Sequence, residues 1–187
     1  MRFRRGALAV LVFAVILAGF TGFYLREQPV PPDSIERMPT YQNEALLARA
    51  WALPVARLYG PQGYLFQQNP STCGPTSIAD VLRSEGRPAD PSSVLNGSGV
   101  LKIFGFLPVG LTLDQEAEIL KRNSGQQVKL LRDLSPDSFR IEIAKSNDPS
   151  RRVIVNFTRQ PLFGRGHGHF SPVLGYLPSE TSCSSAT

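Results

Sequence analysis

The chain has 187 residues, of which 42% are hydrophobic and 19% are charged, and it contains 16 glycines, 16 prolines and two cysteines. This length favours one domain, the hydrophobic fraction excludes a disordered chain, and two cysteines exclude a small fold built on disulfides. The net charge of +5 owes three charges to Arg2, Arg4 and Arg5, and residues 26–187 carry 17 basic and 15 acidic groups, a balance of 17 − 15 = +2. No basic cluster remains, and we expect no nucleic-acid partner.

The N-terminal segment is typical of a signal anchor. Three of the first five residues are arginines, and residues 7–25 follow as 19 residues without a charge. A helix of this length spans roughly 28 Å, close to the hydrocarbon thickness of a bilayer. The positive-inside rule puts the arginines in the cytoplasm and the rest of the chain outside, in the periplasm if the host is bacterial. A cleaved signal peptide, which would give a secreted protein, and a buried core helix are the alternatives.

The chain after residue 25 is interpreted as a linker, one domain and a tail. Residues 26–39 contain four prolines with charges between them, a composition that favours an extended, semi-rigid spacer between the membrane and the domain. The domain covers residues 40–177. Residues 178–187 are rich in serine and threonine and form a low-complexity tail.

Helices predominate in the first part of the domain and strands in the last part. Apolar spacing and capping residues predict helices at 43–50, 73–85, 112–122 and 135–145, with Asn43, Thr112 and Ser135 as caps of the first, third and fourth. Strands are expected at 127–131, at 153–157, which reads as a buried strand, and at 169–176. This order predicts an α+β fold.

The first segment with candidate catalytic residues is a polar loop that ends at Cys73, where a predicted helix begins. The positive end of the helix macrodipole favours a thiolate at this position, and the thiolate is the nucleophilic form of cysteine. Gly74 would leave the approach to the sulfur open. Gln67, six residues earlier, could share an oxyanion hole with the backbone N–H of Cys73. The structural alternative is a small buried cysteine at a helix start.

The second segment with candidate catalytic residues is a glycine-rich loop that carries the only two histidines of the chain, His167 and His169. Two histidines two residues apart can bind a metal, but no cluster of carboxylates or cysteines nearby completes a ligand set, so we expect no metal site. A Cys–His pair can be distant in sequence, which makes His169 a candidate base for Cys73. His169 begins an apolar strand, whereas His167 lies in the glycine run and is assigned to the rim.

Together these two segments resemble the corresponding motifs of the phytochelatin synthases, a papain-like clan of cysteine transpeptidases. The resemblance rests on Gln67-x5-Cys73-Gly74 and on Gly168-His169-Phe170-Ser171-Pro172, and it extends from about Tyr64 to Tyr176. It implies a papain-like fold with a helical N-terminal part and an antiparallel sheet in the C-terminal part, here preceded by a transmembrane helix. The Gly-His-Phe-Ser-Pro segment after an Asn-Phe-x-Arg strand is its most specific feature.

The resemblance also implies an activity. Cys73 would attack the Cys–Gly bond of glutathione, and His169 would assist the departure of glycine. The γ-Glu-Cys acyl group would then pass to a second glutathione or to water. Such enzymes require no cofactor and respond to heavy metals such as Cd or Zn, commonly as metal–glutathione thiolates. Short bacterial members, which this chain resembles, tend toward hydrolysis.

Substrate contacts are expected at Gly74, Gly168 and Arg159, because Arg forms bidentate contacts with carboxylates; a solvated charge past a strand is the alternative for Arg159. Asn156, in the same predicted strand, is expected to be structural.

The family pattern has one gap in this sequence. Its third catalytic residue is an Asp after the histidine, but no Asp follows Asp148, and Glu180 is the nearest acidic residue. The sequence is therefore expected to lack the C-terminal end of the catalytic core, which puts its activity in question. Cys183 is interpreted as an incidental thiol. A different papain-like peptidase, such as a Gly-Gly leader processor, and an inactive thiol- or metal-binding remnant are the competing hypotheses.

Overall fold

The computed structural model of the protein describes Val15 and residues 29–178. The predicted signal anchor at 7–25 lies outside the described residues apart from Val15, and so does the predicted tail from residue 179 onward. Within the described part, no helix is both long and apolar enough to cross a membrane.

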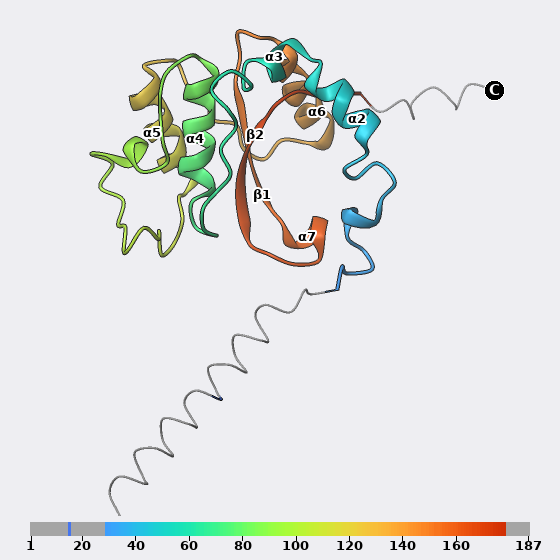
Figure 1. Ribbon diagram of the computed structural model, residues 1–187, viewed down its shortest axis with the longest axis horizontal. Helices are drawn as coiled ribbons and strands as arrows, with labels where there is room; N and C mark the ends of the chain where they lie inside the picture. Colours follow the sequence, from blue (N-terminus) through green and yellow to red (C-terminus); the bar gives the residue numbers. More distant parts are fainter. Residues whose placement is uncertain (1–14, 16–28, 179–187) are drawn as a thin grey trace, which may run out of the picture.

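The described chain is a mixture of helices with one small antiparallel sheet, in agreement with the α+β prediction (Figure 1). The α-helices are α2 (Glu44–Trp51), α3 (Pro54–Arg57), α4 (Cys73–Ser84), α5 (Leu113–Ser124), α6 (Pro136–Ala144) and α7 (Gln160–Phe163). The described residues also form three 3-10 helices: η1 (Ile35–Arg37) before α2, η2 (Ser93–Leu95) between α4 and α5, and η3 (Lys145–Asn147) after α6. The strands are β1 (Val153–Thr158) and β2 (Gly168–Val173).

The predicted helix caps are confirmed. The Asn43 side chain accepts a hydrogen bond from the backbone N–H of Leu46 at 3.1 Å. Thr112 and Gln115 form a reciprocal capping box at the start of α5. At the start of α6 the Ser135 hydroxyl accepts a hydrogen bond from the backbone N–H of Ser138 at 3.2 Å. Each cap satisfies backbone donors that have no partner inside the helix, which explains why these residues mark the helix starts.

The strand predictions are confirmed at two of three places. β1 and β2 pair antiparallel, with Phe157 opposite His169. β1 is half-buried with two exposed positions, so the expectation of a fully buried strand was wrong. Residues 127–131 form no strand: Val128 and Leu130 alternate with polar residues, but no other segment of the described chain offers this stretch a hydrogen-bonded ladder. Alternation alone does not make a strand without a partner.

Helix α4 is the centre of the core. Its buried side chains Ile78, Ala79 and Leu82 pack with Ile119 of α5 and Leu107 of the preceding loop. On its other side α4 contacts β2, so this helix lies between α5 and the sheet (Figure 1). The N-terminus of α4 is thereby held against the strand that carries His169.

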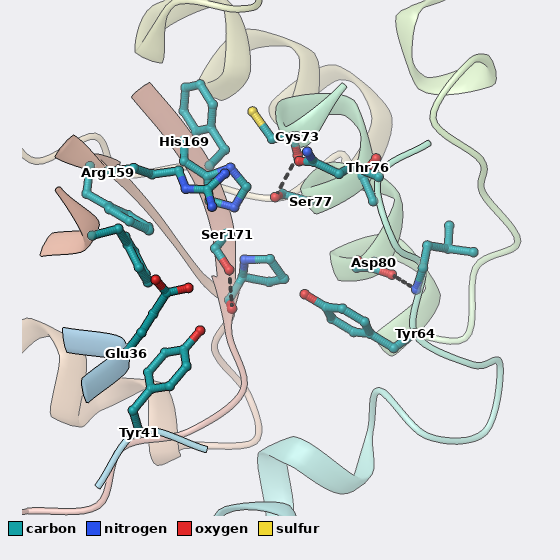
Figure 2. A pocket seen from close by; sticks show the side chains of 16 residues that line it. Glu36, Tyr41, Tyr64, Cys73, Thr76, Ser77, Asp80, Arg159, His169 and Ser171 are labelled. Carbon is teal, nitrogen blue, oxygen red and sulfur yellow. Dashed lines mark hydrogen bonds between the residues drawn. The ribbon is translucent and has the colours of Figure 1, made fainter. Parts of the chain in front are cut away.

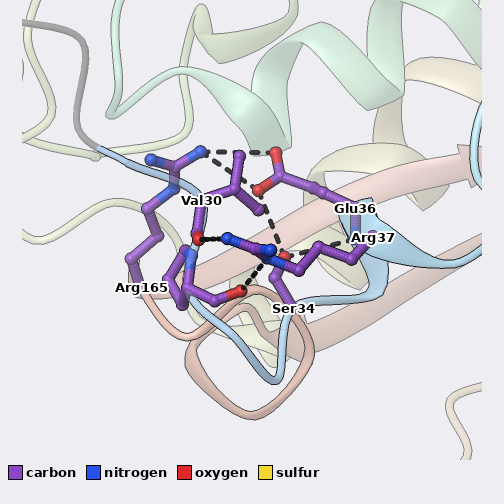
Figure 3. A network of polar contacts seen from close by, with 6 residues as sticks. Val30, Ser34, Glu36, Arg37 and Arg165 are labelled. Carbon is purple, nitrogen blue, oxygen red and sulfur yellow. Dashed lines mark hydrogen bonds and ion pairs between the residues drawn. The ribbon is translucent and has the colours of Figure 1, made fainter.

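The proline-rich segment folds against the domain, so the prediction of an extended spacer is wrong for its described part. Residues 35–37 form η1, and Glu36 makes an ion pair with Arg165 at 3.1 Å (Figure 3). The Arg37 guanidinium donates to the backbone carbonyls of Val30 and Pro31 at 2.7 and 3.0 Å. The ion pair joins residues 129 positions apart, so the proline content of the segment gives no sign of it.

Candidate active site

A pocket of about 340 Å³ lies between α4 and β2 (Figure 2). It brings together residues that are up to 136 positions apart in the sequence, from Glu36 to Pro172. Four of the six predicted site residues line it: Gln67, Cys73, Arg159 and His169. Its wall also includes Glu36, Tyr41, Tyr64, Thr76, Ser77, Asp80 and Ser171.

Cys73 is the first residue of α4 and is half-buried with a free thiol. The N-cap residue Thr72 makes no side-chain cap, and Pro75 in the first turn has no N–H. The Ser77 hydroxyl donates to the Cys73 carbonyl at 2.8 Å, which fastens the first turn. A helix end of this kind carries partial positive charge, and the Cys73 side chain lies at that end.

The loop before Cys73 is held by Asn69. Its Oδ1 accepts from the backbone N–H of Ser71 at 3.0 Å and from the Ser71 hydroxyl at 2.6 Å, while Nδ2 donates to the Gly105 carbonyl at 3.2 Å. The Ser71 hydroxyl in turn accepts from the N–H of Leu107 at 3.0 Å. This network ties the residues before the cysteine to the 105–107 loop and so restrains the position of the thiol.

Gln67 lies on the pocket wall with its Oε1 buried and without a hydrogen-bond partner. Rotation of the amide plane would present Nε2 in its place. The structure thus places Gln67 at the same pocket as Cys73, and its role as an oxyanion donor stays a prediction.

His169 is the second residue of β2 and its ring packs edge-to-face on Phe157, with ring centres 5.6 Å apart. The Asn156 amide donates to the His169 backbone carbonyl at 3.4 Å, in line with a structural role for Asn156. Burial, and after it the positive charge of Arg159, lowers the pKa of His169 below its ordinary value. The imidazole is thus neutral near pH 7 and able to accept a proton.

Arg159 follows β1 and borders the pocket next to His169. Its guanidinium lies over the Phe163 ring, 5.4 Å from the centroid, and its backbone N–H donates to the carbonyl of His167 at 3.0 Å. His167 itself is exposed in the loop before β2, as expected for a rim residue. Arg159 therefore provides a cation at the pocket edge, beside the histidine.

Two glycines predicted to contact the substrate, Gly74 and Gly168, lie outside the pocket lining. A Cβ on Gly74 would lie 2.5 Å from Oε2 of Glu116 and 2.9 Å from Leu111, so the missing side chain allows α4 to pack closely on α5. Gly168 is exposed, with nothing within 4 Å of such a Cβ.

Sequence reasoning missed most of the pocket wall. Asp80 could have been found, because it follows Cys73 by seven residues, about two helical turns, and so shares its face of α4. Glu36 and Tyr41 gave no sequence signal, since they reach the pocket only through the folding of the proline-rich segment.

The described residues contain no group of three or more His, Cys, Asp or Glu side chains that could hold a metal ion. Glu180, the predicted substitute for the third acid, and Cys183 lie outside the described residues.

A cysteine at a helix start and a neutral histidine on an antiparallel strand, lining one pocket, define a candidate cysteine-dependent acyl-transfer site. Residues 105–183 match the family model described as phytochelatin synthase. The chain thus carries a phytochelatin synthase family domain over these residues, which confirms the resemblance. The match contains Arg159 and His169, while Gln67 and Cys73 precede it. Comparison with the curated proteins gives no match.

Proposed function

We propose that the protein is a glutathione γ-glutamylcysteinyltransferase or peptidase with a papain-like fold. The observation that carries this proposal is the convergence of Cys73, His169, Gln67 and Arg159 on one pocket, from two distant parts of the chain. The family match over residues 105–183 supports glutathione as the substrate.

In the proposed first step, His169 accepts the thiol proton of Cys73, and the sulfur attacks the carbonyl carbon of the cysteinyl residue of glutathione. A C–S bond forms as the C–N bond to glycine breaks, and the imidazolium returns its proton to the leaving nitrogen. Glycine departs and a γ-Glu-Cys thioester remains on Cys73. In the second step, the amino group of another glutathione, or water, attacks the thioester carbon and gives up a proton to His169. The C–S bond to Cys73 breaks, the γ-Glu-Cys product leaves, and His169 returns the proton to the released sulfur.

Arg159 supports this sequence in two ways. Its guanidinium can pair with the glycine carboxylate of glutathione, which fixes the end of the substrate that leaves. Its positive charge also disfavours the imidazolium form of His169. A lower pKa makes the imidazolium a stronger acid, which gives its proton to the leaving amine more readily. Both effects act at the same edge of the pocket, where glycine would depart.

The negative oxygen that forms during each attack would be stabilised by the backbone N–H of Cys73 and the Gln67 amide. Loss of one such donor commonly costs a factor of about 10² to 10³ in turnover. Metal ions such as Cd or Zn would enter as glutathione thiolates, that is, as part of the substrate.

Glycine release tests the proposed function. The purified full chain is incubated with glutathione, with and without Cd, and free glycine, γ-Glu-Cys and longer γ-Glu-Cys peptides are measured by mass spectrometry. We expect glycine release that Cys73→Ala abolishes and Cys183→Ala, the matched change at the other cysteine, leaves intact. Equal release by the parent chain and Cys73→Ala would refute the thiol mechanism, and no release from the parent would favour the inactive remnant.

We further propose, from the sequence of residues 1–25, that the protein is anchored in the inner membrane with its domain in the periplasm, or is secreted if the segment is cleaved. The uncharged stretch and the preceding arginines support this topology. Protease added to intact spheroplasts should degrade the domain of an anchored chain; a domain protected until the membrane is lysed would contradict it.

A further inference from the structure

Asp80 is a buried acid that the mechanism above does not use. It lies on α4, lines the pocket with Cys73, and is 1% exposed. Its Oδ1 accepts a hydrogen bond from the backbone N–H of Leu65 at 2.8 Å, as drawn in Figure 2. Its Oδ2 is buried and has no hydrogen-bond partner. One oxygen of this carboxyl thus holds the Leu65 backbone in place, whereas the other oxygen lacks a hydrogen-bond partner at the pocket wall.

The charged neighbour of Asp80 is already engaged. Arg83, one turn further along α4, lowers the pKa of Asp80 only in part, and its Nε donates to the carbonyl of Gly63 at 3.2 Å. Burial is the larger effect and raises the pKa of Asp80 to about 6, so the carboxyl is still mostly ionised above neutral pH. A buried carboxylate without a full set of partners is costly, and a bound cation would relieve that cost.

The spacing along α4 matches the proposed donor group. Seven residues separate Cys73 from Asp80, which corresponds to roughly 10 Å along the helix axis and to nearly the same face. In a γ-Glu-Cys acyl group, seven bonds join the thioester carbon to the amino nitrogen of the glutamyl end, a reach of about 9 Å when extended. An acyl group on Cys73 that lies along α4 therefore brings its ammonium to the unsatisfied oxygen of Asp80.

We propose that Asp80 binds the α-ammonium group of the γ-glutamyl end of the donor and thereby selects γ-glutamyl substrates. This inference rests on the proposed function, and it assigns one end of the pocket to an alkylammonium group. The opposite end, at Arg159, takes the glycine carboxylate. The ammonium of the donor then faces an anionic side chain and its glycine carboxylate faces a cationic one, with the scissile bond at Cys73.

The test compares two ligands that differ only in the ammonium group. Full-length Cys73→Ala protein and the Cys73→Ala, Asp80→Asn double variant are titrated calorimetrically with glutathione and with N-glutaryl-cysteinylglycine, which lacks the amino group. Asn retains an oxygen that can accept from Leu65, so the local fold is preserved. We expect Asp80→Asn to weaken glutathione binding at least tenfold and to change binding of the desamino ligand less than twofold.

Equal weakening of both ligands would show that Asp80 only supports the loop, and an unchanged affinity for glutathione would refute the inference outright. Should the double variant fail to fold, Cys73→Ala alone decides: it should bind glutathione at least tenfold more tightly than the desamino ligand, and equal affinities overturn the inference. Because binding is measured without turnover, this result is independent of the glycine assay that tests the proposed function.

Discussion

Glu116 offers the sharpest test of how the site is built. It lies on α5 directly beneath the first turn of α4, is 3% exposed, and has no hydrogen-bond partner for either carboxyl oxygen. Burial raises the pKa of Glu116 from its ordinary 4.5 to about 8, so the carboxyl is held protonated at neutral pH. We predict that Glu116→Gln, which keeps the shape and removes the ionisation, makes the stability of the protein less dependent on pH.

The magnitude follows from proton linkage. Between pH 4.5 and 8 the unfolded chain loses the Glu116 proton while the folded chain retains it, so the free energy of unfolding falls as pH rises, by up to about 1.4 kcal/mol per pH unit. Below pH 4.5 both states are protonated, and above pH 8 both are ionised, so the effect is confined to this window. At pH 7 the accumulated destabilisation from Glu116 is on the order of 3 kcal/mol.

Urea unfolding of the parent and Glu116→Gln proteins at pH 5, 6, 7, 8 and 9 measures this directly. The stability difference in favour of the variant should grow from near zero at the acid end to about 3 kcal/mol at pH 7 and level off above pH 8. Glu118→Gln, the same change on the exposed side of α5, is the matched control and should show no such growth. A difference that does not vary with pH, or a variant that is less stable throughout, would refute the reasoning.

Three further predictions concern Gly74, Arg159 and Gln67. Gly74→Ala should destabilise the protein by about 1 to 3 kcal/mol in urea unfolding through overpacking against α5, whereas Gly168→Ala, in open space, should have little effect; equal effects would contradict the packing argument. Arg159→Gln should raise the pKa of His169 and move the acid limb of the kcat/KM profile for glycine release to higher pH, and an unmoved limb would count against their coupling. Gln67→Ala should lower kcat about 10² to 10³-fold, and a change confined to KM would exclude an oxyanion role.

The helices, their caps and the two segments that carry Cys73 and His169 were predictable from the sequence, because each depends on neighbouring residues. The caps at Asn43 and Thr112 and the helix that begins at Cys73 depend on contacts within a few residues, and all were found in the structure. Residues 127–131 show where local signals stop: Val128 and Leu130 alternate with polar residues, but a strand exists only if another segment pairs with it.

By itself, the sequence determined the chemistry that is present: a cysteine at a helix start, a histidine at a strand start, and a resemblance that the family match confirms. Only the tertiary structure decided that these two residues line one pocket. It also brought Glu36 to that pocket through a segment predicted to be a spacer, and it left Asp80 and Glu116 buried with unsatisfied oxygens. Burial and long-range contacts arise from packing between distant segments, and no spacing or composition within one segment encodes them.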